Sequence, residues 1–149
     1  MNKRLLVAIP VGLLVLIQLV PYRVNNPPVQ QGPSWDSPAT EALARKACFD
    51  CHSNEVRVPW YGYIAPTAWA VRYHVDEARE ALNFSELNLP QKEVHEAVKM
   101  VRKAYMPPDY YLTLHSEANL SDDERTTLAK GLKITLAPFV KKHHEEDDD

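Results

Sequence analysis

The chain has 149 residues, with 17 Lys and Arg against 20 Asp and Glu and a formal net charge of −3. This length suits one domain with a short appendage. The basic residues are scattered along the chain, so the composition gives no support to nucleic-acid binding. Only 4 glycines accompany 12 prolines, which favours a helical chain with stiff corners over a β-barrel with many tight turns.

An apolar segment opens the chain. Lys3 and Arg4 precede an almost unbroken apolar run over residues 5–20. The residues after it lack the small-x-small site that a signal peptidase requires, which favours an uncleaved signal anchor over a cleaved signal peptide. The two cations favour a cytoplasmic location for the N-terminal end of the chain. We therefore predict a single-pass helix in the cytoplasmic membrane over residues 1–20, with the rest on the periplasmic or other extracytoplasmic side.

Three further regions follow the apolar segment. Residues 21–36 are rich in proline, asparagine and glutamine and have no apolar periodicity, which predicts an extended, Pro-rich tether. Residues 37–140 are predicted to form one all-α domain. The acidic residues 141–149 are predicted to be a disordered tail.

About four helices are expected in that domain. The first begins at Ser37-Pro38, an N-cap followed by proline at the first helical position, and carries two cysteines at its C-terminal end. The second begins at Pro66 and stops around residue 83, and the third begins at 88–90 and continues to about 104. The last begins with a capping box at residues 121–124 and ends near Ala137, because Pro138 follows.

The two cysteines of the chain lie in one motif, Cys48-Phe49-Asp50-Cys51-His52. This is the C-x-x-C-H pattern of covalent c-type haem attachment. Cys48 and Cys51 can add to the two vinyl groups of a protoporphyrin, and the short spacing then places His52 under the iron as the proximal ligand. The predicted cofactor is one covalent haem c.

Three other interpretations of the motif remain open. A zinc site would use the two cysteines and His52, but structural zinc usually needs a further ligand pair, and no other cysteine exists. A thioredoxin-like dithiol needs a βαβ setting, whereas the surrounding pattern is helical. A disulfide would close a very short loop and stabilise little.

Aromatic side chains follow the motif. Trp60, Tyr61 and Trp69 are candidates for the wall of a haem pocket, because flat apolar rings can lie along a porphyrin while their polar atoms face propionates or water. The alternative is an ordinary loop that covers the core.

A sixth iron ligand is expected from one of five side chains: Met100, Met106, His74, His95 and His115. We favour Met106, because Pro107 excludes it from the helix and its soft thioether then lies on a stiff loop. His74 is its main rival. Met100 is expected to pack within the third helix, His95 to face solvent, and His115 to be available to a propionate.

Many separated motifs resemble the bacterial haem-binding domain family, which is related to cytochromes c. The resemblance covers about residues 38–137. Its motifs are Cys48 to Glu55, Pro59-Trp60-Tyr61, Ile64-Ala65-Pro66, Trp69, His74-Val75, Leu82 to Ser85, Met106-Pro107, Tyr111, His115, Ala118 and Leu120-Ser121. The resemblance implies a mostly helical monohaem fold with Cys48 and Cys51 as attachment residues and His52 as axial ligand.

These patterns predict a membrane-tethered, cytochrome c-like carrier that passes single electrons to a redox partner protein of unknown identity. No acid–base constellation argues for an enzyme, since the carboxylates are spread over helix caps and the tail. A haem-based sensor of gas or redox state, with a displaceable sixth ligand, is the alternative. Peroxidase activity is a third possibility and requires an open distal face.

Overall fold

The computed structural model describes residues 3–140, and this part of the chain is mostly helical, as predicted. Within it, the β pairing consists of an isolated parallel bridge between Gln31 and Glu86. The tail predicted to be disordered, 141–149, lies outside the described residues. The helices are α1 (Lys3–Ile17), α2 (Pro38–Ala47), α3 (Phe49–His52), α4 (Thr67–Ala81), α5 (Ala97–Arg102), α6 (Asp109–Leu112) and α7 (Asp122–Thr135), with 3₁₀ helices η1 (Trp60–Tyr63) and η2 (Ser116–Ala118).

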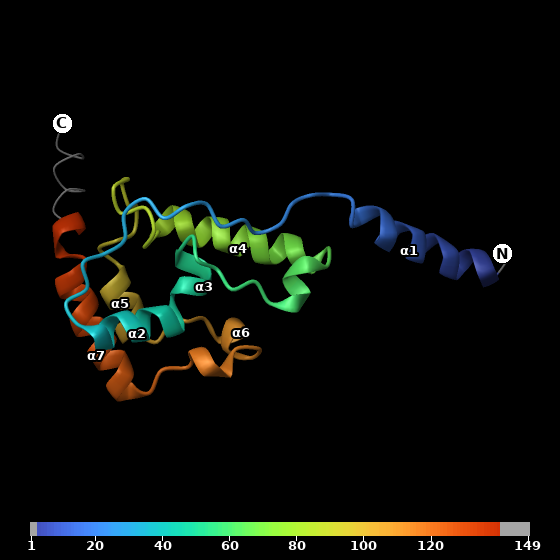
Figure 1. Ribbon diagram of the computed structural model, residues 1–149. Helices are drawn as coiled ribbons and strands as arrows, with labels where there is room; N and C mark the ends of the chain where they lie inside the picture. The colour runs from blue at the N-terminus through green and yellow to red at the C-terminus, as the bar shows by residue number, and fades with distance from the viewer. Residues whose placement is uncertain (1–2, 141–149) are drawn as a thin grey trace.

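The α1 helix stands apart from the domain and extends away from it (Figure 1). It corresponds to the transmembrane segment predicted over residues 1–20 and is 15 residues long. Within residues 3–140, no helix combines the length and the hydropathy needed to cross a membrane. The helix ends where the Gln18 side chain turns to the domain: Gln18 Nε2 donates to the Ala65 carbonyl at 3.0 Å, and Ala65 N donates to Gln18 Oε1 at 2.9 Å.

Residues 21–36 are extended and lie along the domain (Figure 1). The Asn26 side chain forms two hydrogen bonds with the backbone of Val56, at 2.9 and 3.1 Å. Further along, Gln30 N donates to the Ser85 carbonyl at 2.9 Å. The segment predicted as a tether is therefore bonded to two loops of the domain.

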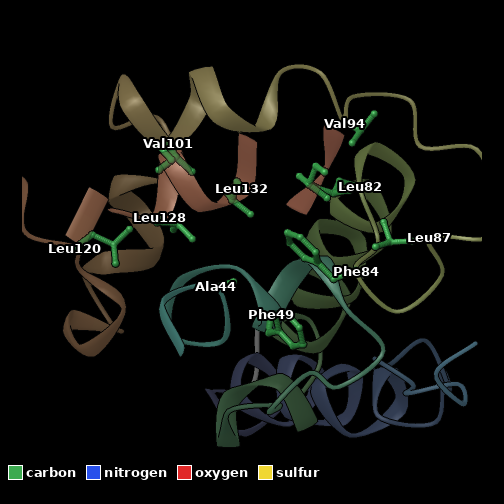
Figure 2. Close-up of a cluster of buried hydrophobic side chains, with 12 residues drawn as sticks. Ala44, Phe49, Leu82, Phe84, Leu87, Val94, Val101, Leu120, Leu128 and Leu132 are labelled. Carbon is green, nitrogen blue, oxygen red and sulfur yellow. The ribbon is translucent and has the colours of Figure 1, made fainter. Parts of the chain in front are cut away.

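The core lies between α2, α5 and α7 and continues to the loops after α3 and α4 (Figure 2). Leu128, Leu132 and Leu136 form the buried stripe of α7 that their spacing of four residues predicts. Phe49 stacks on Phe84, with ring centroids 5.6 Å apart and planes 14° apart. This stack joins the start of α3 to the chain that follows α4.

Two predicted helices differ from those observed. The first is interrupted at Cys48, because α2 ends at Ala47 and α3 begins at Phe49. The third was predicted to begin at residues 88–90, which is wrong, since α5 begins at Ala97. Residues 91–96 are instead bonded to the end of α4: the buried Gln91 side chain accepts from Asn83 N at 2.7 Å, and Glu93 N donates to the Ala81 carbonyl at 2.8 Å.

The predicted capping box of the last helix is confirmed. Ser121 Oγ accepts from Glu124 N at 3.2 Å, and Glu124 Oε2 accepts from Ser121 N at 2.9 Å. The helix ends at Thr135, slightly before the predicted end at Ala137.

α2 and α7 pack closely at Gly131. A Cβ atom on Gly131 would lie 1.9 Å from Thr40 Oγ1 and 2.5 Å from Thr40 Cγ2. Gly131→Ala should therefore lower the free energy of unfolding by about 1–3 kcal/mol, because the overpacked helices must separate. Urea unfolding followed by circular dichroism measures the change.

The double variant Gly131→Ala/Thr40→Ala supplies the control. Thr40→Ala removes the contacts at 1.9 and 2.5 Å and leaves Thr40 Cβ 2.7 Å from the new Cβ, so only part of the lost stability should return. If Gly131→Ala is as stable as the parent protein, the close packing of α2 on α7 is not a constraint.

Candidate functional site

A cavity of about 510 Å³ lies beside the C-x-x-C-H motif. Its wall is formed by the end of α2, α3, one face of α4, α5, the chain from Met106 to Pro108, and α6. Four alanine side chains are part of this wall: Ala47, Ala78, Ala81 and Ala97. The volume lies within the range of about 300–1,000 Å³ that is usual for cofactor and ligand sites.

His52 reaches the cavity in one defined tautomer. Its Nδ1 lies 2.9 Å from the Leu82 carbonyl oxygen. Because a carbonyl only accepts, Nδ1 carries the proton and Nε2 has a free lone pair. Burial lowers the pKa of His52, against the opposing effect of the Leu82 and Ala78 carbonyls, so the ring is neutral at pH 7. A neutral imidazole held through its second nitrogen has the form of a metal ligand.

Both cysteines line the same cavity as His52 and are free thiols. Burial raises the pKa of Cys48 to about 12 and that of Cys51 to about 11. Such thiols stay protonated at pH 7, which does not suit the thiolate chemistry of a redox dithiol. A thioether has no proton to lose, so the same surroundings accept it without an ionisation cost. Within residues 3–140, no group of three or more His, Cys, Asp or Glu side chains could hold a metal ion.

Three of the five candidate sixth ligands line the main cavity: Met106, Met100 and His74. His115 lines a smaller, adjoining cavity of about 190 Å³, where its Nε2 lies 2.7 Å from the Tyr61 hydroxyl oxygen. His95 is exposed, with Nε2 4.0 Å from a Glu96 carboxylate oxygen. The structure therefore brings together the favoured ligand, its rival and Met100, which was expected to serve only in packing.

The turn that presents Met106 forms at the end of α5. Tyr105 N donates to the Met100 carbonyl at 3.0 Å, and Ala104 N donates to the Val101 carbonyl at 3.1 Å. These bonds form a Schellman motif with Ala104 at the left-handed position, with φ of 57°. The helix thus ends at Arg102, so the turn, rather than Pro107 alone, takes Met106 out of it.

Arg125 of α7 holds the same turn from the other side. Its Nη1 donates to the carbonyls of Val101 at 3.2 Å and Met106 at 3.1 Å. Its Nη2 donates to the Leu120 carbonyl at 3.4 Å. One guanidinium group therefore connects α5, the Met106 loop and the segment before α7.

The predicted aromatic residues do not gather around the main cavity. Trp60 is 75% exposed. Trp69 lines neither cavity, and its Nε1 is a buried atom with no hydrogen-bond partner among the described residues. Tyr61 lines the smaller cavity. The aromatic side chains that line the main cavity are instead Phe84 and, from α6, Tyr110 and Tyr111.

Tyr111 also fastens α6 to α3. Its hydroxyl donates to Asp50 Oδ2 at 3.2 Å, and Arg57 Nη2 donates to the same oxygen at 3.0 Å. Burial raises the pKa of Tyr111, and the Asp50 charge adds to this effect, so the phenol stays a donor. The Asp50 carboxylate, in the middle of the C-x-x-C-H motif, therefore has a positioning role.

Sequence reasoning did not single out Tyr110 and Tyr111 as cavity residues, and it assigned Met100 to packing. The sequence did contain one sign of a cavity beside α4. Ala78 and Ala81 are three residues apart, so their small side chains leave space on one face of that helix. The tyrosines gave no such signal, since α6 is only four residues long.

A family model described as a haem-binding domain matches residues 12–134. No match was found among the curated proteins. No solved structure matched the chain.

The left-handed residue of the Met106 turn makes a stability prediction. Ala104→Gly should raise the free energy of unfolding by about 1 kcal/mol, because glycine accepts positive φ without the steric cost that a Cβ imposes. Chemical denaturation measures this gain.

Lys103→Gly is the matched control, since Lys103 is the neighbouring residue and has φ of −84°. There the glycine should lower stability by about 0.5–1 kcal/mol. Equal effects of the two substitutions would contradict the assigned turn.

Proposed function

Because this chain belongs to the haem-binding domain family, we propose that its main cavity holds one haem c and that the protein passes single electrons outside the cytoplasmic membrane. One observation carries the proposal. The two thiols of the C-x-x-C-H motif and a neutral imidazole with a free Nε2 line the same cavity. These are the residues that covalent attachment and proximal ligation require.

The cavity residues have separate tasks in this proposal. Cys48 and Cys51 hold the cofactor as thioethers, and His52 supplies Nε2 to the iron. Bound haem supplies a one-electron couple. Ala78 and Ala81 of α4 give room for a flat group, and the apolar side chains of the wall would limit the access of water to it. Glu77, Glu93 and Glu96 also line the cavity.

Met106 is proposed as the sixth ligand, with His74 as its rival. A thioether opposite an imidazole raises the reduction potential relative to two imidazoles. The Schellman turn and Arg125 hold the Met106 backbone from both sides, which supports a fixed ligand. Met100 lines the same cavity and is a further rival.

We also propose that α1 attaches the protein to the cytoplasmic membrane, with the domain on the extracytoplasmic side. The support is the exposure of its side chains: each Leu, Ile and Val from Leu6 to Leu16 exposes more than half of its surface. Exposing such a helix to water is unfavourable, whereas the acyl chains of a bilayer solvate it well. The redox partner is proposed to be a protein at the same membrane.

One observation favours the second candidate, a haem-based sensor of gas or redox state. Met106 is 37% exposed and lies on a loop, whereas an electron carrier benefits from a ligand that stays in place. A thioether at the edge of the cavity can leave the iron without disturbing the core, and an external ligand can replace it.

Covalent attachment makes the first prediction of this proposal. Protein made in a host competent for cytochrome c maturation should have the mass of its polypeptide plus one haem, and the haem should stay attached on unfolding in acidified acetone. Cys48→Ala and Cys51→Ala should each retain one thioether. The double variant should lose the haem under the same conditions. A mature mass equal to that of the bare polypeptide would contradict the proposal.

The axial ligand makes the second prediction. The oxidised protein should be low-spin and show a sulfur-to-iron absorption band, and Met106→Ala should abolish that band. Met100→Ala and His74→Ala are the matched controls, because both residues line the same cavity, and both variants should keep the band.

Carbon monoxide separates the two candidate functions. An electron carrier should keep its spectrum under carbon monoxide, while Met106→Ala should bind the gas. Ready binding by the unmodified protein would favour the sensor. The sixth ligand would be reassigned if the absorption spectrum of the oxidised protein were unchanged in Met106→Ala but changed in His74→Ala or Met100→Ala.

A further inference from the structure

Exposed apolar side chains gather where α1 leaves the domain. Trp60, Tyr63 and Ile64 are 75%, 56% and 49% exposed. Leu19 and Val20, just after α1, are also exposed. We call these five residues the aromatic patch. The hydrogen bonds between Gln18 and Ala65 join the two parts of the patch, because Gln18 precedes Leu19 and Ala65 follows Ile64.

The position of the patch relative to α1 is fixed by a second set of contacts. The Arg72 guanidinium of α4 donates to the Arg23 carbonyl at 3.1 Å and to the Asn25 side-chain oxygen. With the Gln18 bonds, these contacts hold both sides of the turn after α1 against the domain. Figure 1 shows η1, the green turn before α4, at the end of the domain from which α1 departs.

The charges near the patch favour an anionic surface. The chain has 20 acidic residues, but none occurs in residues 1–35 or 56–75. These two stretches contain the apolar helix, the turn after it, η1 and most of α4. The cations near the patch are Arg23, Arg57 and Arg72, of which Arg57 pairs with Asp50 and Arg72 with Asp76, while Lys3 and Arg4 lie at the opposite end of α1. Basic residues beside an apolar segment are attracted by anionic lipid headgroups.

The length of α1 points in the same direction. Its 15 residues extend over about 22 Å at 1.5 Å per residue, against about 30 Å for the hydrocarbon core of a bilayer. An apolar segment that is shorter than the hydrocarbon core draws its flanking residues toward the lipid. Trp and Tyr are the residues that membrane–water interfaces favour.

We propose that Trp60, Tyr63 and Ile64 enter the headgroup region of the bilayer that holds α1, so that the domain sits on the membrane in one orientation. This inference rests on the proposed membrane attachment and is independent of haem binding. The ligand is the lipid surface itself. Trp60 and Tyr63 lie at the level of the headgroups, and Ile64 and Leu19 reach the upper acyl chains.

Fluorescence quenching by brominated lipids tests the contact. The full chain is reconstituted in vesicles of phosphatidylcholine and phosphatidylglycerol, with bromine on the acyl chains near the glycerol end. The protein has three tryptophans, of which Trp35 packs against the core and Trp69 is partly buried. Trp60 should therefore supply the quenched emission. In Trp60→Phe, the tryptophan emission should be the same in brominated and in ordinary vesicles.

Trp69→Phe is the matched control and should keep that difference. Flotation of the vesicles tests the membrane attachment of the protein separately from the lipid contact of the patch. If the protein floats but brominated lipid leaves the Trp60 emission unchanged, the membrane attachment stands and the patch lies in water, which overturns this inference. If the protein does not float, both the attachment and the lipid contact are overturned.

Discussion

The hydrogen bond from His52 Nδ1 to the Leu82 carbonyl determines what the site can do. It is available because Leu82 follows α4 in an extended conformation, with φ of −156° and ψ of 123°. Its oxygen therefore leaves the helical hydrogen-bond pattern. The chain then turns back, and Phe84 N donates to the His52 carbonyl at 2.8 Å. These two bonds connect the motif to the end of α4, so the tautomer and the direction of the imidazole depend on where one helix ends.

A buried polar cluster supports this connection. Asn54 N donates to Ser85 Oγ at 2.9 Å, and Asn83 Nδ2 donates to Asn54 Oδ1 at 3.0 Å. Gln91 completes the cluster by accepting from Asn83 N at 2.7 Å. Apolar packing alone tolerates small shifts between two segments, whereas a satisfied polar network accepts one arrangement. The cluster therefore sets the register between the C-x-x-C-H motif and α4.

The sequence predicted the elements with strong local signals, such as the last helix, which begins with the capping box at Ser121. It also pointed to Cys48, Cys51 and His52, which line one cavity, while their role toward haem stays a prediction. It failed at residues 91–96, where the buried Gln91 side chain bonds to Asn83 N, a tertiary contact that overrides apolar spacing. The place of Met100 in the cavity was missed for a similar reason. That position depends on how α5 faces α4, which no spacing within α5 reveals.

The extended segment over residues 21–36 has a mechanical consequence. Asn26 is bonded to the loop after α3, and Gln30 is bonded to the loop after α4. For the membrane-attached carrier proposed here, these bonds make the linker a rigid connection between α1 and the domain and not a flexible tether. Such a domain cannot move away from the membrane to meet a distant partner, so it exchanges electrons only with molecules that come into contact with it. Its turnover then depends on the lateral diffusion of the carrier and its redox partner in the plane of the membrane.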